Sequence, residues 1–319
     1  MSAILYLSED DIARLDIGIA DIHAAVQAAF RAKTAGRSLM KPKLSIAPRP
    51  GNVAEALVGA ALDEGIAVCK WLGVSRSNAA AGLPTIHAEI LLSGLEDGRL
   101  RTIMNGGWIT GVRTAACTAI AADHLARADS SAIGFIGCGL QARTHLAALR
   151  HVRPGLRAAH LFSRTRETAR RFAEHCARQG IEATICAEPR QAVEASDIVV
   201  STVPPSGELR PFLDAGWVRP GGFVAAVDLG RSWKPESWRG AFAFVATDDR
   251  EQSETRGRAG TMLASDRFDA ELGELDGRAA GPDGRTAMLF SGIALADLAV
   301  AALVERRAHE EGIGTLLPR

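Results

Sequence analysis

The segment of residues 131–164 restricts the possible folds of this chain more than any other stretch. It has the pattern of a short apolar strand, a glycine turn at 137–142, a helix and a second strand at 158–163. The turn reads G-x-G-x-x-A: the first glycine permits a tight turn, the second lets a pyrophosphate approach the backbone, and the alanine lets helix and strand pack closely. The helix N-terminus presents free N–H groups to phosphates. Rather than a purely structural turn, we predict a dinucleotide-binding βαβ unit with cofactor contacts at Gly137, Gly139, Leu140, Gln141 and Ala142.

The composition excludes several other classes of protein. Acidic and basic residues are equal in number, 37 of each, so the chain has no net field that would attract nucleic acid or an anionic membrane. The five cysteines lack the spacing of a zinc site or a disulfide framework, which is typical of reduced thiols in the cytoplasm. No apolar run approaches the roughly 18 residues of a membrane helix, and the first residues lack the pattern of a signal peptide. We therefore expect a cytoplasmic protein without a metal centre.

The order of the predicted elements indicates two kinds of sheet. Before the glycine turn, strands follow one another without intervening helices, which predicts an antiparallel or mixed sheet. After the turn, strands and helices alternate, which predicts a parallel sheet of an α/β protein. The predicted strands of the first part are 4–7, 54–62, 65–72 and 85–92, and those of the second are 182–186, 197–203, 222–229 and 242–248. Helices are predicted at 19–35, 110–127, 165–179, 189–195 and 293–310, and a loop-rich stretch with a short helix at 260–286.

Several motifs together resemble those of the ornithine cyclodeaminase/μ-crystallin family. They are GLPT at 82–85, ITGVRTAA at 109–116 and GCGLQA at 137–142, with TDDREQ at 247–252 and GIGT at 312–315. The resemblance implies a Rossmann NAD(P)-binding domain at 128–292. That domain would be inserted in a discontinuous α+β domain, 1–127 completed by 293–319, that binds substrate and forms a homodimer. Members include cyclodeaminases, amino-acid dehydrogenases, ketimine and imino-acid reductases and opine-type synthases, so the resemblance defines the NAD(P)H chemistry better than the substrate.

The resemblance also implies roles for four polar residues of the first domain. Lys70 follows the apolar run 65–69 of the predicted strand 65–72, and Arg113 lies in the first turns of an alanine-rich helix. Such positions are ordinarily solvent-exposed, but here they match the active-site lysine and the carboxylate-binding arginine of the family. Lys43 stands where relatives usually carry a substrate-binding arginine, and a lysine there offers a point charge without bidentate geometry. Thr85 matches a threonine of the substrate pocket.

The stretch 226–234 departs from the family pattern in an informative way. Its alignment places Gly230 where cyclodeaminases have a catalytic aspartate, and Asn105 is a second position where many relatives carry an acid. Without the carboxylate, the deprotonations of a cyclodeamination become harder, whereas reduction of a preformed imine needs one proton donor. Asp228 is the candidate replacement for the missing acid. Arg231 is either a cation for a second substrate carboxylate or a solvent-facing loop residue.

Two further segments are expected at the cofactor. The end of the second strand carries Ser163, Arg164 and Thr165 in place of the acid that binds the ribose of NAD, which favours NADP(H) and leaves NAD(H) possible. Thr202, Val203 and Pro204, continuing to Pro205, follow a buried strand and are expected against the nicotinamide half.

These observations predict an NAD(P)H-dependent reductase of a small α-imino acid. The candidate substrates are iminosuccinate, suggested by Arg231, and a cyclic ketimine such as pyrroline-2-carboxylate; the reverse reaction is that of an amino-acid dehydrogenase. The alternatives are an ornithine or lysine cyclodeaminase that releases ammonia, a non-catalytic NADP-dependent binding protein and an opine-type synthase. The expected partners are a small-molecule substrate and a second copy of the chain, with neither nucleic acid nor membrane.

Overall fold

The chain forms two compact units, which are described separately. The computed structural model describes residues 3–204, 209–278 and 284–319. Unit 1 comprises residues up to 113 together with 293–319, and unit 2 comprises residues 114–292. The first division lies inside helix α3 (Gly107–Leu125), and the second lies just before helix α9 (Ala294–Glu311). The boundary expected from the sequence lay after residue 127, whereas the structure divides α3 between the two units.

Unit 1 contains an eight-stranded mixed sheet. Its strands pair antiparallel, apart from β1 and β7, which run parallel. This agrees with the antiparallel or mixed sheet expected from the sequence, although β2, β3, β7 and β16 were not predicted. In spatial order the strands are β16 (Thr315–Leu317), β1 (Ile4–Leu7), β7 (Leu100–Asn105), β6 (Ile86–Gly94), β5 (Ile66–Ser75), β4 (Asn52–Ala61) and β2 (Ser38–Met40), and β3 (Leu44–Arg49) also pairs with β4.

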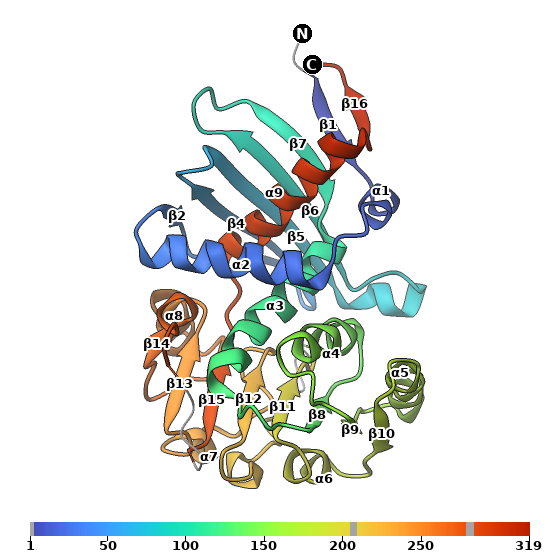
Figure 1. Cartoon of the computed structure of the whole chain (residues 1–319), viewed down its shortest axis with the longest axis vertical. Helices are drawn as coiled ribbons and strands as arrows, with labels where there is room; N and C mark the ends of the chain where they lie inside the picture. Colours follow the sequence, from blue (N-terminus) through green and yellow to red (C-terminus); the bar gives the residue numbers. More distant parts are fainter. Residues whose placement is uncertain (1–2, 205–208, 279–283) are drawn as a thin grey trace. The chain divides into compact units, whose positions relative to one another are not determined.

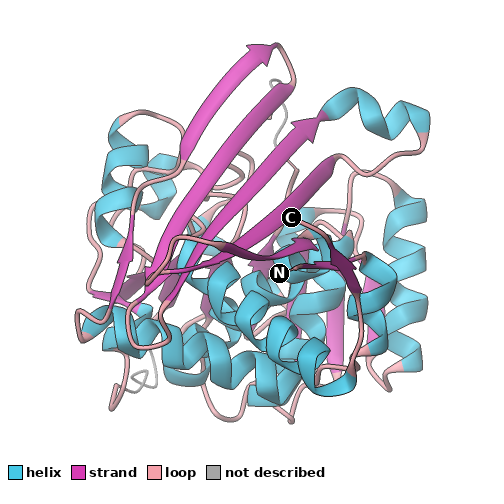
Figure 2. Cartoon of the chain, turned by 90° about the horizontal axis from the view of Figure 1, so that it is seen from above, coloured by secondary structure: helices cyan, strands magenta, loops and turns pink. Residues whose placement is uncertain are grey.

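Helices α2 (Ile19–Thr34) and α9 contact each other, and α9 covers one face of this sheet, which we call the inner face (Figures 1 and 2). Alternate strand residues turn toward it because side chains in a strand alternate between faces. Leu57, Val68 and Ile90 are buried there, and α2 adds a stripe of buried side chains four residues apart at Ile22, Val26 and Phe30. A capping box at Ser8 begins the short helix α1 (Glu9–Arg14).

Unit 2 is a Rossmann domain, which confirms the predicted α/β fold class. Its eight strands pair in parallel throughout. Their order is β10 (Glu182–Ile185), β9 (Ala158–Phe162), β8 (Ala132–Ile136), β11 (Ile198–Ser201), β12 (Phe223–Ala226), β15 (Thr286–Leu289), β13 (Phe244–Thr247) and β14 (Ala270–Glu271). The sequence did not predict β14 and β15, which lie in or border the stretch read as loop-rich. The helices of the unit beyond α3 are α4 (Leu140–Val152), α5 (Arg166–Arg178), α6 (Pro189–Glu194), α7 (Pro235–Trp238) and α8 (Arg250–Arg258) (Figure 1).

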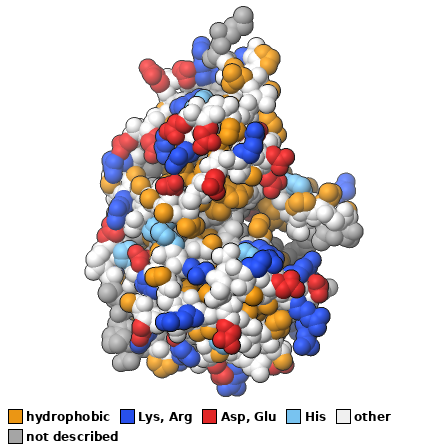
Figure 3. All heavy atoms as spheres, turned by 45° about the vertical axis from the view of Figure 1, so that its right-hand side comes forward, with side chains coloured by type: hydrophobic (Ala, Val, Ile, Leu, Met, Phe, Trp, Pro, Cys, Tyr) orange, Lys and Arg blue, Asp and Glu red, His pale blue; other side chains and the backbone are white. Residues whose placement is uncertain are grey.

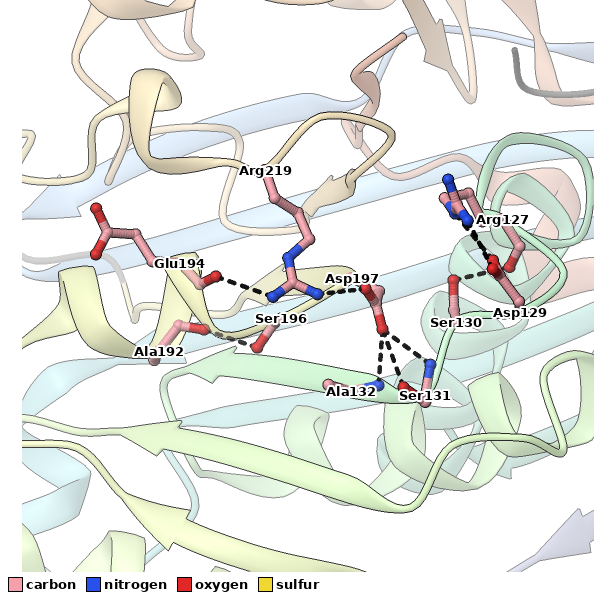
Figure 4. A network of polar contacts seen from close by, with 10 residues as sticks. All are labelled: Arg127, Asp129, Ser130, Ser131, Ala132, Ala192, Glu194, Ser196, Asp197 and Arg219. Atoms are coloured by element: carbon pink, nitrogen blue, oxygen red, sulfur yellow. Dashed lines mark hydrogen bonds and ion pairs between the residues drawn. The ribbon is translucent and has the colours of Figure 1, made fainter. Parts of the chain in front are cut away.

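A polar network joins the amino ends of neighbouring strands of unit 2 (Figure 4). Asp197 accepts hydrogen bonds from the backbone N–H groups of Ser131 and Ala132, at 2.9 and 3.0 Å, and pairs with the Arg219 guanidinium at 2.6 Å. Although burial raises the pKa of the Asp197 carboxyl, these donors outweigh it and hold that pKa below its usual range. The network thus fixes the starts of β8 and β11, whose other ends carry the cofactor residues.

Within the described residues, no helix combines the length and the hydropathy that crossing a membrane requires.

Candidate active site

The glycine turn lies at the point of unit 2 where the strand order reverses, between β8 and β11. In open parallel sheets this switch point is where nucleotides bind, at the carboxyl ends of the strands. Gly137 has φ +99°, and a Cβ there would lie 2.9 Å from the carbonyl oxygen of Thr202, so only glycine fits. Gly139 is the N-cap of α4 without a side-chain cap, and nothing lies within 4 Å of the place of its Cβ. The turn therefore leaves backbone donors and open space for a pyrophosphate, and a dinucleotide fits it.

The other expected cofactor residues of unit 2 surround this turn. Thr202 follows β11 and donates its hydroxyl hydrogen to the carbonyl oxygen of Gly137 at 3.1 Å. Val203 and Pro204 come next, whereas Pro205 lies outside the described residues. At the end of β9, Ser163 is half-buried, the exposed Arg164 follows it, and Thr165 is the N-cap of α5. Leu140, Gln141 and Ala142 form the first turn of α4, where Ala142 is fully buried.

In unit 1, two of the predicted cations converge on one carboxylate that the sequence did not reveal. Lys70 lies within β5, which covers most of the predicted strand 65–72, and its Nζ donates to Asp297 Oδ1 at 2.9 Å. Arg113 Nε donates to the same oxygen at 3.0 Å. Lys70 and Asp297 are fully buried, and Arg113 is 5% exposed. Asp297 belongs to the first turn of α9, so the cluster joins segments more than 180 residues apart in the chain.

The cluster changes the proton affinity of Lys70. Burial lowers the pKa of its ammonium to about 8, and the charges of Arg113 and Lys43 act in the same direction. The Asp297 carboxylate opposes them and raises that pKa by its charge and its hydrogen bond. The second oxygen of Asp297, Oδ2, is buried without a hydrogen-bond partner among the described residues. Lys70 is thus an ammonium that can release its proton near neutral pH, as a general acid must.

Lys43 completes the cluster from the segment before β3. Its Nζ lies 4.0 Å from Glu55 Oε2, and the other carboxylate oxygen of Glu55 accepts a hydrogen bond from Ser45 Oγ at 2.8 Å. Glu55 is two residues from Leu57, which pairs with Lys70 in the sheet, so Glu55 and Lys70 face the same side. The structure therefore brings Lys43, Lys70 and Arg113 together, with Asp297 and Glu55 as their counter-charges.

Thr85 lies away from this cluster. It precedes β6 rather than beginning it, and its carbonyl oxygen accepts a hydrogen bond from Ser75 N at 2.9 Å. Ser75 is five residues beyond Lys70 on β5, a separation of roughly 17 Å along a strand. Within unit 1, Thr85 is consequently not part of the Lys70 cluster.

Asp228, Gly230 and Arg231 form a turn after β12 in unit 2. Both oxygens of Asp228 accept hydroxyl hydrogen bonds, from Ser201 at 3.0 Å and from Ser232 at 2.6 Å. Burial raises the pKa of the Asp228 carboxyl to about 6, although these hydroxyls lower it. Arg231 Nε donates to the carbonyl oxygen of Asp228 at 3.2 Å. Asp228 thus anchors the turn to β11.

The missed carboxylates, Asp297 and Glu55, gave only a weak signal in the sequence. Asp297 interrupts the apolar run ALADLAVAALV of α9, where an acid on a buried face calls for a partner. Nothing local in the sequence identifies that partner, because both cations come from distant elements.

A Rossmann unit with an intact glycine turn, in a chain whose other unit holds a buried lysine–arginine–aspartate cluster, defines a nicotinamide-dependent oxidoreductase. The model of the ornithine cyclodeaminase/mu-crystallin family matches residues 8–312, and the chain belongs to that family.

Relatives match almost the whole chain. The alanine dehydrogenase of Archaeoglobus fulgidus is 29% identical over 98% of this chain and 97% of its own length. The solved structure of the Thermococcus litoralis Δ1-pyrroline-2-carboxylate reductase, in complex with NADH and L-proline, is 27% identical with a TM-score of 0.88 and covers 98% of this chain and 99% of its own. An archaeal alanine dehydrogenase dimer with bound NAD is 27% identical with a TM-score of 0.85, covering 99% of both chains. The cofactor is thus a nicotinamide dinucleotide.

Proposed function

We propose that this protein is an NAD(P)H-dependent reductase of a small α-imino acid, and that in reverse it is an amino-acid dehydrogenase. The observation that carries the proposal is Lys70, a fully buried ammonium with a pKa of about 8 beside two further cations, Lys43 and Arg113. In keeping with it, one relative with a solved structure holds NADH and L-proline, and another is named for the dehydrogenation of alanine. The candidate substrates are a cyclic ketimine such as pyrroline-2-carboxylate and the open-chain iminosuccinate.

Each residue of the cluster has a role in this proposal. Reduction of an imine adds a hydride to the carbon and a proton to the nitrogen, and the bound nicotinamide supplies the hydride. Arg113 offers a planar fork to the α-carboxylate, and Lys43 adds a point charge. Lys70 donates the proton to the imine nitrogen and regains one from water. Asp297 holds both Lys70 and Arg113 by one oxygen and keeps their side chains in place.

The turn after β12 argues against a cyclodeaminase. Gly230, where those enzymes carry their catalytic aspartate, has φ +67°, and a Cβ there would lie 2.6 Å from Leu263 Cβ. An aspartate at this position would need a different backbone. We assign to Asp228 the positioning of this turn and of Arg231, because both of its carboxylate oxygens are engaged by serine hydroxyls.

The decisive experiment follows the absorbance of reduced nicotinamide with purified protein. NADH and NADPH are each offered with pyrroline-2-carboxylate and with imines formed from oxo acids and ammonia. Stoichiometric cofactor oxidation with any one of these imines supports the proposal. Ammonia release from ornithine or lysine without net oxidation would instead show a cyclodeaminase, and tight cofactor binding without any turnover would show a binding protein.

Replacing Asp297 with asparagine should move the pH dependence of imine reduction. Since Asp297 raises the pKa of Lys70, its neutralisation lowers that pKa below the value of about 8. Reduction needs protonated Lys70, so the rate of the wild type falls as the pH rises through about 8, and that of the variant falls at lower pH. The measurement is kcat/KM from pH 5.5 to pH 9.5. If kcat/KM of the variant fell at the same alkaline pH as that of the wild type, Asp297 would not control the pKa of Lys70.

We further propose a preference for NADP(H) over NAD(H). Ser163, Arg164 and Thr165 follow β9 where an acid would bind the ribose hydroxyls of NAD, and the exposed Arg164 suits a 2′-phosphate. Basic side chains also gather on the α4 and α5 side of unit 2 (Figure 3). Dissociation constants for NADPH and NADH, measured by fluorescence titration at two ionic strengths, test this. Equal dissociation constants for NADPH and NADH would show that Arg164 does not bind the 2′-phosphate.

We also propose that unit 1 binds the substrate and forms a homodimer through the outer face of its sheet, opposite α9. Tyr6, Val58 and Trp71 are 38, 47 and 51% exposed on three of its strands, and apolar side chains that share one exposed face are typical of a protein–protein interface. A relative with 27% identity is an alanine dehydrogenase dimer. Sedimentation equilibrium should give twice the chain mass of 33.7 kDa. Because all five cysteines are free thiols, we place this dimer in the cytoplasm.

A further inference from the structure

We infer that the substrate site accepts imino acids with a single carboxylate, and that Glu55 is the residue that rejects a second one. This inference rests on the proposed function and selects between its two candidate substrates, against iminosuccinate. Three features of unit 1 support it: the position of Glu55 in the sheet, the ion pairs that already engage the nearby cations, and the apolar residues next to Glu55 on β5 and β6.

The strand register places Glu55 beside Lys70 on the inner face. Lys70 pairs with Leu57 of β4 and with Ile90 of β6. Two residues along, Glu55 pairs with Leu72, so the Glu55 and Lys70 positions are diagonal neighbours, roughly 7–8 Å apart. Glu55 is therefore close enough to act on a substrate whose imine nitrogen lies at Lys70.

Glu55 is held in place as a charged group. Ser45 lies directly opposite it on β3, and the Ser45 hydroxyl donates to Oε1 at 2.8 Å, while Lys43 Nζ lies 4.0 Å from Oε2. Its side chain is 17% exposed. A fixed carboxylate with little access to water repels a second carboxylate more strongly than an exposed one would.

The charges of the cluster match one substrate carboxylate. Lys43, Lys70 and Arg113 are the cations, and Glu55 and Asp297 are the anions, so one positive charge remains when Lys70 is protonated and the imine nitrogen is neutral. The α-carboxylate of the substrate neutralises this charge. A second carboxylate would find every cation of the cluster already paired.

The neighbours of Glu55 on β5 and β6 are apolar, whereas Lys43 and Ser45, on its other side, are already engaged by the Glu55 carboxylate. Leu72 pairs with Ala88 in the same row of the sheet, and both are buried. In the following row, Val74 pairs with Ile86. A substrate side chain that extends along these rows meets apolar atoms and the Glu55 carboxylate. This suits an alkyl chain or ring and leaves a carboxylate desolvated without a partner.

Two oxo acids of equal length test this selection. With ammonia, 2-oxobutyrate and oxaloacetate give imines that differ only in a terminal methyl or carboxylate group. We expect kcat/KM to be at least about tenfold higher for the imine of 2-oxobutyrate. Without ammonia, the same oxo acids serve as unreactive probes of affinity for the protein with bound oxidised cofactor, measured by calorimetry. There, 2-oxobutyrate should bind at least about tenfold more tightly.

Glu55→Gln keeps the shape and the acceptor oxygen for Ser45 but removes the charge. It should reduce the discrimination between the two oxo acids by about tenfold in binding. The control is Glu96→Gln in the exposed β6–β7 turn, which should leave it unchanged. Equal or tighter binding of oxaloacetate by the wild type would overturn the inference, as would unchanged discrimination in the correctly folded Glu55→Gln protein. If 2-oxobutyrate binds as expected but no imine is reduced, the proposed function fails while the inference about charge selection stands.

Discussion

Replacing Lys70 with methionine should lower kcat/KM for imine reduction by about 10²- to 10⁴-fold, the range that a general acid contributes. Methionine fills much of the volume of the lysine stem and tolerates the apolar surroundings. The variant therefore removes the proton and the charge without opening a large cavity. Asp297 keeps its bond with Arg113 Nε, at 3.0 Å, so the guanidinium stays anchored. Cofactor affinity should not change, because the glycine turn belongs to the other unit.

The matched control is Lys41→Met, which removes an exposed lysine from the same segment as Lys43. It should retain the activity of the wild type. Fluorescence titration with NADPH and a thermal melt of each variant separate a catalytic loss from misfolding. A Lys70→Met protein that is folded, binds cofactor and reduces the imine at a near-normal rate would show that another group donates the proton.

The parts of the fold that the sequence revealed are those with strong local signals. The βαβ unit around Gly137 was predicted because glycine spacing, an apolar strand and a following helix occur together within about 30 residues. β3 was missed because its sequence LSIAPR alternates over only three residues before a proline, and all six of its residues are exposed, so no buried face marks it. β15 was missed for the opposite reason: its four residues are all buried, and a short apolar run has no periodicity to distinguish it.

Only part of the candidate site could be predicted from the sequence, for a related reason. Lys70 and Arg113 were identified because they match positions of the family pattern, whereas Asp297 was not, because its contacts join residues 184 and 227 positions apart. Thr85 matches a threonine of the family's substrate pocket, and in the structure its carbonyl oxygen accepts a hydrogen bond from Ser75, at the end of the β5–β6 pair away from Lys70. Pairing across a sheet depends on register, and register is a property of the folded chain.

Arg153 is expected to stabilise unit 2 more than any surface ion pair. Its guanidinium lies at the end of α3 and donates to the carbonyl oxygens of Ala122, Asp123 and Ala126, at 2.7–2.8 Å, and to that of Arg127 at 3.1 Å. The last carbonyl groups of a helix have no partners within it, and a cation there also opposes the negative end of the helix dipole. Arg153 is only 7% exposed, so water would replace these bonds poorly.

Arg153→Met should therefore lower the free energy of unfolding by about 3–5 kcal/mol, the cost of removing one partner from a buried charged network. A thermal midpoint about 10 °C lower is the corresponding shift for a unit of this size. Arg153→Lys should restore only part of this free energy. It keeps a cation at the end of the helix, but one ammonium cannot reach all the carbonyl groups that the planar guanidinium spans. Arg190→Met is the control: it breaks an exposed pair with Glu194, whose side chains are 62 and 46% exposed, and should cost less than about 0.5 kcal/mol. If Arg153→Met and Arg190→Met unfolded at the same denaturant concentration, the C-terminus of α3 would not depend on this cap, because its carbonyl groups would be satisfied equally well by water.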